Sequence, residues 1–510
     1  MRTLPYIAED AHGIRSLMVD GRPYMGLAGE LKNSSSSSSE WMARKVWPAL
    51  EPLGLDTVLL PIAWEMMEPE EGRFDFSLVD AVLGQARERG ARLVLLWFGL
   101  WKNAESMYTP LWVKRDTGRF WLARHRFSGA TLSISPLCRE AVQADARAFG
   151  RLMAHLRETD GTAQTVIMVQ VENEIGFLGS ERDFSPAAEA AFLSDIPEAL
   201  AAFFHTGGSW SQAFGEDAPE IFMAWHYAQA VEHITQAGKA AYNLPMYVNA
   251  WLEQHPCRPG RYPSGGPIAR MMPVWKLGAP SVDLFAPDIY VSDFAGTCAE
   301  YAATDNPLLL PEVRRDPVTA SNVFYAFGHH KAILYAPFGI DEFMDHQEYQ
   351  PNTALLNHLN IDIESFNCAG TAPYLIPSYR LLREARPFLL AHRGQMQGFI
   401  KKSGHDRGCV LSAQACDLIV SYPDEERGKP GSAGLWMELE NDTFLFMGCR
   451  FWVEPVPKRN ARRQIAVLRL EEGRFEQGEW VAGRVLNGDE KDLLRCGDTA
   501  SCFKFTIGQV

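Results

Sequence analysis

Eight short apolar runs, separated by longer stretches with helical periodicity, most constrain how this chain can fold. The runs are Tyr24–Ala28, Thr57–Ile62, Arg92–Phe98, Thr165–Val171, Met246–Val248, Val282–Ala286, Leu308–Leu310 and Ala332–Tyr335. Continuous apolar strands separated by helices are typical of a parallel sheet that is buried on both faces. Eight such strands match the strand count of a (β/α)₈ TIM barrel. The sequence therefore predicts an α/β protein built on a TIM barrel, with a doubly wound open sheet as the structural alternative.

The pattern changes near Gly394, just after an expected helix over Ser378–Ala391. Beyond it, segments of alternating polarity dominate, with turn signals between them. These segments are Val410–Tyr422, Leu435–Glu440, Thr443–Val453 and Ile465–Leu470. We therefore expect residues 1–394 to form the catalytic barrel and residues 395–510 to form a smaller β-rich accessory domain of the sandwich type.

Charge and cysteine usage narrow the class of partner. The net charge is −14 without a long basic run, which argues against nucleic acid and anionic membranes as partners. The chain has no apolar stretch of about 18 residues that could span a membrane, and its start lacks the apolar core of a signal peptide. The nine cysteines form no CxxC pair, so we expect reduced thiols and no cysteine-bound metal. We expect a cytoplasmic protein, or a periplasmic one if a leader is missing from the sequence.

Polar and aromatic residues follow the apolar runs at their carboxyl ends, where TIM barrels keep their active sites. In chain order they are Glu30, Glu65, Trp101, Asn103, Glu105, Asn173, Glu174, Trp251, Tyr290 and Glu312. Carboxylates are costly to bury without a partner, so a ring of them requires a function. Carboxylates beside aromatic rings suit a sugar, whose hydroxyls take hydrogen bonds and whose C–H face stacks on indole. The sequence predicts a carbohydrate substrate and no cofactor or metal.

The most specific signal is a pair of glutamates. Asn173-Glu174 ends the fourth run and Glu312 ends the seventh, the arrangement of the large clan of retaining (β/α)₈ glycosidases. Across a barrel mouth, two such carboxyls can face each other at about 5–5.5 Å, the separation of retaining enzymes. We expect both glutamates to be catalytic.

Several motifs narrow the match to one family. They are Gly29-Glu30-Leu31 on the first strand, Trp64 followed by Glu68–Phe76 on the second, and Asn103-Ala104-Glu105 on the third. With the glutamate pair, they make most of Tyr24–Glu342 resemble bacterial β-galactosidases of glycoside hydrolase family 35. The six serines Ser34–Ser39, with Asn33 before them, resemble the Asn-Ser-Ser loop of the family's bacterial branch. We therefore expect a structured loop near the site, with a capping box from Ser37 to Glu40.

The resemblance implies a role for each catalytic glutamate. Glu312 would attack the anomeric carbon, and Glu174 would act as the acid and then as the base. Asn173 would bind the sugar 2-hydroxyl, Asn103 and Glu105 would bind other hydroxyls, and Tyr290 would orient Glu312. Glu30, Asn33 and Glu65 are further candidate substrate contacts, and Trp101 and Trp251 are candidate stacking residues.

Two departures from the family leave the natural substrate and linkage open. Lys32-Asn33 stands where animal and plant members carry His-Tyr, and Pro61 stands where they carry a sugar-binding tyrosine. Three alternatives to a β-galactosidase remain: a transglycosidase, a β-glycosidase of different sugar specificity, and a non-catalytic carbohydrate-binding barrel. The oligomeric state, including a homo-oligomer, also stays open.

Overall fold

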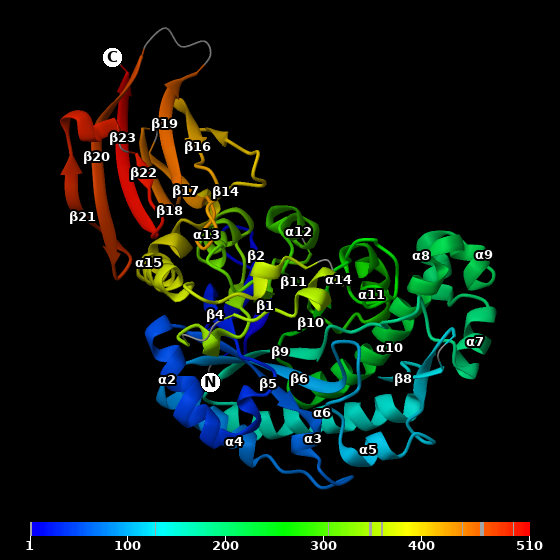
Figure 1. Ribbon diagram of the computed structural model, residues 1–510. Helices are drawn as coiled ribbons and strands as arrows, with labels where there is room; N and C mark the ends of the chain where they lie inside the picture. The colour runs from blue at the N-terminus through cyan, green and yellow to red at the C-terminus, as the bar shows by residue number, and fades with distance from the viewer. Residues whose placement is uncertain are drawn as a thin grey trace.

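Eight parallel strands close into a barrel (Figure 1). The computed structural model describes residues 3–127, 129–303, 305–345, 349–358, 361–440, 442–458, 464–492 and 494–509. In order around the barrel, the strands are β4 (Gly26–Glu30), β5 (Thr57–Ala63), β6 (Arg92–Lys102), β9 (Val166–Asn173), β10 (Met246–Trp251), β11 (Leu284–Ile289), β12 (Leu310–Val313) and β13 (Leu334–Pro337). Each overlaps one predicted apolar run or adjoins its end. The predicted TIM barrel is confirmed, and the doubly wound alternative is wrong.

Helices connect the strands and cover the outside of the barrel. The main ones are α2 (Trp47–Leu50), α4 (Ser77–Glu88), α6 (Arg139–Asp160), α10 (Ala218–Ala241), α11 (Met272–Gly278), α12 (Phe294–Tyr301), α13 (Thr319–His330) and α15 (Ala372–Ala391). The predicted last helix, Ser378–Ala391, is α15, which begins six residues earlier, at Ala372. Among the described helices, none is both long and apolar enough to cross a membrane.

A small antiparallel sheet packs against the barrel core at its N-terminal end. It consists of β1 (Tyr6–Glu9), β2 (Arg15–Val19) and β3 (Arg22–Pro23). Leu17 and Val19 from β2 are buried with residues of the barrel interior such as Leu59 and Leu284. The turn between β2 and β3 is Asp20-Gly21, and both residues have positive φ, as a tight hairpin requires. The sequence analysis did not predict this sheet, which leaves the opposite end of the barrel for the site.

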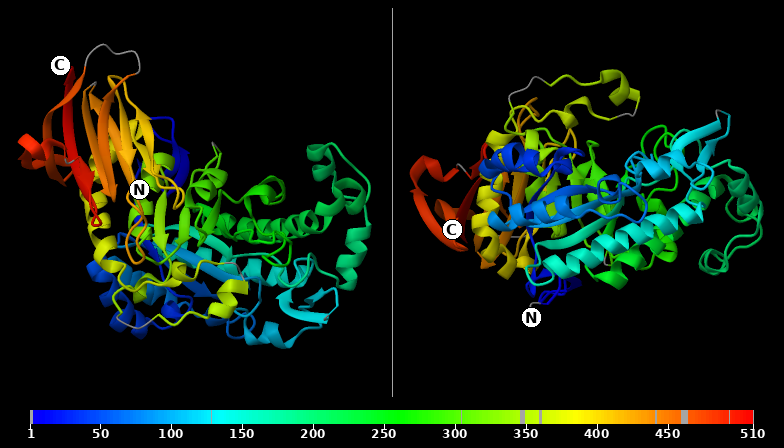
Figure 2. Two further views of the ribbon diagram at one scale, coloured as in Figure 1. Left: turned by 45° about the horizontal axis from the view of Figure 1, so that its top comes forward. Right: turned by 90° about the horizontal axis from the view of Figure 1, so that it is seen from below.

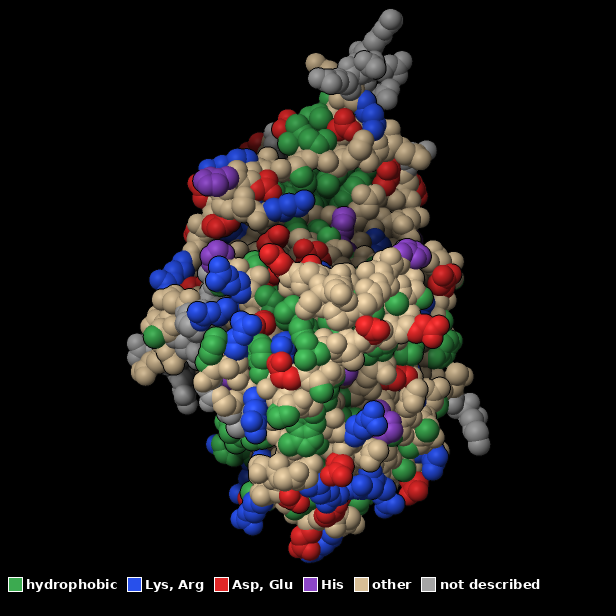
Figure 3. Space-filling model, turned by 90° about the vertical axis from the view of Figure 1, so that its right-hand side faces the viewer, with side chains coloured by type: hydrophobic (Ala, Val, Ile, Leu, Met, Phe, Trp, Pro, Cys, Tyr) green, Lys and Arg blue, Asp and Glu red, His purple; other side chains and the backbone are tan. Residues whose placement is uncertain are grey.

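Two insertions lie between the barrel strands. The hairpin of β7 (Leu122–His125) and β8 (Gly129–Ile134) precedes α6. Three short helices, α7 (Pro186–Leu193), α8 (Glu198–Phe204) and α9 (Trp210–Phe214), precede α10 and project from one side of the barrel (Figure 2). The face that includes these helices carries interspersed acidic and basic side chains, without a continuous basic patch among the residues coloured there (Figure 3).

The C-terminal part consists of two antiparallel sheets, as the predicted β-rich region requires. One contains β14 (Gln397–Ile400), β17 (Ala433–Glu440), β18 (Thr443–Cys449), β20 (Ile465–Glu476), β21 (Glu479–Leu486) and β23 (Ser501–Gln509). The other contains β15 (Gly408–Ser412), β16 (Cys416–Ser421), β19 (Phe451–Pro457) and β22 (Arg495–Cys496). Aromatic residues from both sheets, among them Phe446 and Phe451, share one buried cluster. The predicted single runs Val410–Tyr422 and Thr443–Val453 are each two strands.

The C-terminal sheets also share a core with the barrel. Leu435 and Met447 from the larger sheet belong to the same buried cluster as Phe327 of α13. A Cβ atom on Gly328 would come within 2.8 Å of the Gln397 carbonyl oxygen, so α13 and β14 are in close backbone contact. The division of the chain after Gly394 stays a prediction, because the hydrophobic core is continuous across it.

The serine run is ordered and buried in part. Ser35–Ser37 form one turn of 3₁₀ helix, and the α1 helix (Ser39–Trp41) follows. Ser36 Oγ donates to the Pro61 carbonyl (2.6 Å), and Ser35 Oγ donates to Asp341 Oδ2 (2.6 Å). The loop is therefore bound to the chain just past β13 and to β5. The predicted cap at Ser37 is wrong by one residue, because Ser38 caps the helix by accepting from the Trp41 amide.

Candidate active site

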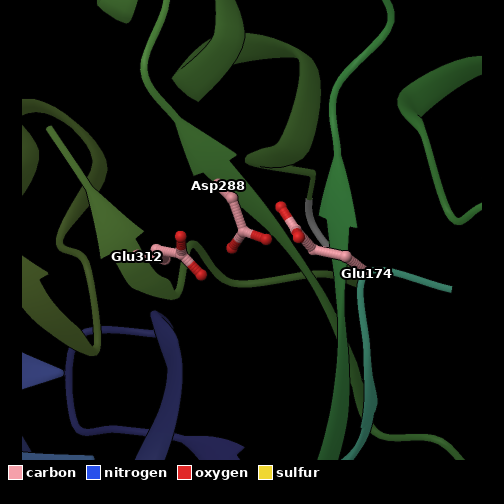
Figure 4. Close-up of side chains that lie close together, drawn as sticks. All are labelled: Glu174, Asp288 and Glu312. Carbon is pink, nitrogen blue, oxygen red and sulfur yellow. The ribbon is translucent and has the colours of Figure 1, made fainter. Parts of the chain in front are cut away.

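Four buried carboxyl groups meet at the carboxyl ends of the barrel strands. They are Glu30 on β4, Glu174 after β9, Asp288 on β11 and Glu312 on β12, and they are exposed by 1%, 6%, 3% and 5%. One oxygen atom from each of Glu174, Asp288 and Glu312 lies within 4.8 Å of the other two. Figure 4 shows Asp288 between the two glutamates. The structure therefore brings together the two predicted catalytic residues and adds a third carboxyl group.

Glu312 has one oxygen held and one left open. Tyr290 donates its hydroxyl to Glu312 Oε1. The other oxygen, Oε2, has no hydrogen-bond partner among the described residues. Burial raises the pKa of Glu312, while the charge of Lys102 and the Tyr290 hydrogen bond lower it. These two contacts favour the ionised form, which is the form needed by a nucleophile.

Glu174 is held in an unusual backbone conformation. Its φ is +45°, and its amide donates to Asn249 Oδ1 (2.9 Å). Asn103, which also has a positive φ, donates its side-chain amide to Glu174 Oε2. Burial, with the negative charge of Glu312, raises the pKa of Glu174 to about 8. At neutral pH Glu174 therefore keeps a proton, as a general acid must.

Asp288 completes the group of three. Its Oδ2 accepts from Asn249 Nδ2 (2.7 Å), and its Oδ1 has no partner atom in the described part of the chain. Burial, together with Glu312 and Glu174, raises the pKa of Asp288 well above its ordinary value.

Lys102 supplies positive charge to the whole cluster. It ends β6, is 6% exposed, and its ammonium nitrogen lies 5.1 Å from the centroid of the Phe98 ring. Its charge lowers the pKa of Glu30, Glu174, Asp288 and Glu312 alike. One cation among four carboxyls leaves some of them neutral, because like charges at this distance cannot all ionise.

The three clustered carboxyls are spaced closely enough to surround a cation. However, protein donors already occupy each of them: Asn103 on Glu174, Asn249 on Asp288 and Tyr290 on Glu312. A buried carboxyl cluster with its own donors and a lysine charge can be stabilised by sharing protons. We therefore interpret the arrangement as an acid–base site.

Two further predicted residues carry unsatisfied polar atoms in the barrel. Asn173 is fully buried, and neither Nδ2 nor Oδ1 has a partner among the described residues. Glu30 Oε1 likewise has none, and burial raises the pKa of Glu30 well above its ordinary value. Buried polar atoms normally have partners, so these atoms are candidates for contact with a ligand.

The other predicted site residues lie outside the cluster. Glu65, on the short α3 helix (Trp64–Met67), pairs with Lys114 (2.8 Å). Glu105 is exposed, and its backbone pairs with that of Lys102. Trp251, at the end of β10, and Asn33 are partly buried, and Asn33 Oδ1 has no partner among the described residues. Their proposed sugar contacts stay predictions.

Trp101 lies in the protein interior, where it contacts Glu172 near the end of β9. It is fully buried, its indole donates to the Ile134 carbonyl (2.9 Å), and its amide donates to Glu172 Oε2 (2.6 Å), which is the setting of a packing residue. Glu172 is hydrogen-bonded to Asp145, and burial, with the Asp145 charge, raises the pKa of Glu172 well above its ordinary value. The contacts of Glu172 with Trp101 and Asp145 therefore fix the backbone two positions before Glu174.

Three participants were absent from the predicted site: Asp288, Lys102 and Asn249. Each lies beyond the end of a predicted run, so register places it near the barrel mouth without assigning it to the site. A carboxyl, an ammonium and an amide are nevertheless common on loops, and only the closed barrel brings these three together.

The Tyr290 contact leads to a prediction about pH. Tyr290→Phe removes a hydrogen bond that lowers the Glu312 pKa, so that pKa should rise. Because Glu312 must be ionised to attack, the acid limb of kcat/KM should move to higher pH, and kcat should fall roughly 10- to 10²-fold. A pH profile with an activated aryl glycoside measures both. Tyr379→Phe is the control, since its buried hydroxyl bonds backbone carbonyls instead. An unshifted acid limb in Tyr290→Phe would contradict the assignment.

Comparison with known families adds two matches. Residues 16–255 match the model of the glycosyl hydrolases family 35, which covers the first five barrel strands. Residues 375–496 match a domain of unknown function, DUF5597, which spans most of the C-terminal sheets. No curated protein matches this chain.

Several solved structures share a distant likeness. A β-galactosidase from Marinomonas ef1 is 13% identical with a TM-score of 0.43, and 75% of this chain covers 62% of that one. A β-galactosidase from Rahnella sp. R3 is 16% identical with a TM-score of 0.40, and 61% of this chain covers 50% of that one. The catalytic domain of a β-amylase from Paenibacillus polymyxa is 11% identical with a TM-score of 0.45, with 66% and 98% covered.

Proposed function

We propose that this chain, whose residues 16–255 match the model of the glycosyl hydrolases family 35, is a glycoside hydrolase that removes terminal β-linked galactose by double displacement. The observation that carries the proposal is the facing pair of Glu174 and Glu312, with carboxyl oxygens within 4.8 Å. That spacing supports a retaining mechanism, because inverting enzymes need about 6.5–9.5 Å to admit a water molecule.

In the first step, Glu312 Oε2 attacks the anomeric carbon. Oε1 stays hydrogen-bonded to Tyr290, and this hydrogen bond orients the carboxyl group so that Oε2 is free to attack. The bond from the anomeric carbon to the glycosidic oxygen breaks, and Glu174 gives its proton to that oxygen. The products are a free alcohol, a glycosyl ester on Glu312 and an ionised Glu174.

In the second step, Glu174 acts as the base. It takes a proton from a water molecule, whose oxygen attacks the anomeric carbon and displaces Glu312. The sugar leaves with its original configuration, and both glutamates return to their starting protonation states. Glu174 suits both roles because a pKa of about 8 lies near neutrality.

Other buried polar groups would hold the sugar. The unpartnered amide of Asn173 lies one residue from Glu174 and supports a contact with the 2-hydroxyl. The open oxygen of Glu30 supports a contact with another hydroxyl. Asn103 already bonds Glu174, so its proposed role is to hold that acid as well as a sugar hydroxyl. All nine cysteines are free thiols, which supports the cytoplasmic location that we propose.

A panel of aryl glycosides tests the proposal. We expect the β-galactoside and the β-fucoside, which share the axial 4-hydroxyl, to exceed the β-glucoside in kcat/KM by roughly 10²-fold, since the glucoside carries its 4-hydroxyl equatorially and leaves the polar groups that bind an axial hydroxyl unpaired. A preference for the β-glucoside would instead assign a different sugar specificity to the same glutamates. Transfer to an added sugar in preference to water would identify a transglycosidase. A chain that binds galactosides without turnover would be the non-catalytic barrel.

A further inference from the structure

The carboxyl group of Asp288 has a defined place for a proton. Asn249 Nδ2 donates to Asp288 Oδ2 (2.7 Å), so Oδ2 serves as an acceptor. Asn249 Oδ1 is itself fixed as an acceptor, because it receives the Glu174 amide (2.9 Å). The remaining oxygen, Oδ1, has no donor directed at it from the described residues. A proton on Asp288 therefore belongs on Oδ1.

The neighbour for that proton is Glu174. One carboxyl oxygen of Asp288 and one of Glu174 lie within 4.8 Å of each other, and a hydrogen bond from Asp288 lowers the pKa of Glu174. The Asn249 side chain thus accepts from the backbone amide of Glu174 and donates to Asp288. A hydrogen bond from Asp288 to the Glu174 side chain closes the chain. Two carboxylates cannot bond each other, so once Glu174 has given up its proton this chain of hydrogen bonds stays closed only if Asp288 is the donor.

The charges around Asp288 favour its neutral form. The titratable groups acting on it from the surrounding elements are Glu30, Lys102, Glu174, Glu312, Tyr247 and Tyr301. Three of these are carboxyls, Lys102 is the cation, and the two tyrosines stay neutral because burial raises their pKa. With one positive charge available, Glu312 takes the negative charge and Asp288 keeps its proton.

We infer that Asp288 is a neutral, proton-holding positioning residue that donates a hydrogen bond to Glu174 and thereby sets the pH range over which Glu174 serves as acid and base. The inference rests on the proposed function, and it adds a third carboxyl group to the two that the reaction requires. When Glu174 has given its proton to the leaving group, the new carboxylate is held by Asp288 and Asn103. Asp288 keeps its own proton throughout, so the proton count of the reaction is unchanged.

Two substitutions separate a neutral donor from a charged carboxylate. In Asp288→Asn, the amide reproduces the protonated acid, with an oxygen to accept from Asn249 and an NH₂ to donate to Glu174. We expect kcat/KM to stay within about tenfold of the wild-type value and its basic limb to move by less than about 0.5 pH unit. Asp288→Leu has a similar shape but no donor, so the pKa of Glu174 should rise and the basic limb should move up by about one pH unit.

Opposite outcomes would overturn the inference. A basic limb that moves down by a full pH unit in Asp288→Asn would mean that Asp288 is ionised, because its charge had been raising the pKa of Glu174. An unmoved limb in Asp288→Leu would mean that Asp288 only packs. The melting temperatures of both variants are measured alongside their pH profiles. A purely structural role would change Tm without moving the basic limb of kcat/KM.

A spectroscopic measurement keeps the inference separate from the proposed function. The infrared spectrum of wild-type protein near pH 7 should contain a protonated-carboxyl band that is absent from Asp288→Asn. This readout needs no turnover. An inactive wild-type enzyme that shows the band would defeat the proposed function alone. An active one without the band would defeat only the assignment of Asp288.

Discussion

Glu312→Ala should abolish turnover of every glycoside, including those with activated leaving groups. Without the carboxylate on β12, no glycosyl ester can form, and the loss should reach roughly 10⁴-fold or more, as it does when other enzymes lose their nucleophile. Hydrolysis of an activated aryl β-galactoside measures the loss. The variant should fold, because removal of one carboxyl from a crowded group relieves repulsion, and its Tm should equal or exceed that of the wild type.

The matched control for this loss is Glu71→Ala. Glu71 is an acid outside the carboxyl cluster and pairs with Arg119. Its removal should leave kcat/KM close to the wild-type value, since exposed ion pairs contribute little. Residual hydrolysis by Glu312→Ala at more than a few per cent of the wild-type rate would contradict its role as nucleophile.

Glu174→Ala should depend on the leaving group. An activated phenol needs little protonation, so the first step survives and the glycosyl ester on Glu312 accumulates as a burst. A poor alcohol leaving group should lose roughly 10²–10⁴ in rate, the usual contribution of general acid catalysis. Paired measurements with a nitrophenyl galactoside and an alkyl galactoside reveal the difference. Equal losses for both substrates would show that Glu174 is not the acid.

Azide distinguishes the two glutamates by product configuration. It needs no base, so it should accelerate Glu174→Ala and give the β-glycosyl azide. In Glu312→Ala, azide would enter from the side of the missing nucleophile and give the α-product. Exchange of these two configurations would mean that the assigned roles are reversed.

The sequence predicted the barrel because its strands are buried on both faces. Such strands appear as continuous apolar runs, and each run stands apart from the next by a helix or a loop. The N-terminal sheet escaped prediction because β1 to β3 are short and few of their apolar side chains, such as Leu17 and Val19 of β2, are buried against the barrel core. The hairpin of β15 and β16 within Val410–Tyr422 and the change of sheet between β18 and β19 within Thr443–Val453 escaped because neither connection has a strong Gly-Pro or Asn-Gly signal.

The sequence could predict those site residues whose role depends only on their position at the end of a strand. Glu174 and Glu312 were predicted from their places at the ends of the fourth and seventh runs together with the resemblance to the retaining clan, and the structure places one oxygen of each within 4.8 Å of the other. Asp288 could not be predicted from register, because its importance comes from Asn249 on the neighbouring strand. Trp101 stands at a strand end as a stacking residue would, yet the bulged end of β6 turns it into the core. Long-range contacts of this kind need coordinates.

The central claim is that a covalent bond forms between the sugar and Glu312 and that Glu174 serves that bond as acid and base. A 2-deoxy-2-fluoro-β-galactoside with a good leaving group tests it most directly, because the fluorine slows the second step and traps the ester. Mass spectrometry of the intact protein and of its peptides should find one fluorosugar per chain, attached to Glu312. A label on Glu174, or burst-free turnover without any label, would contradict the account.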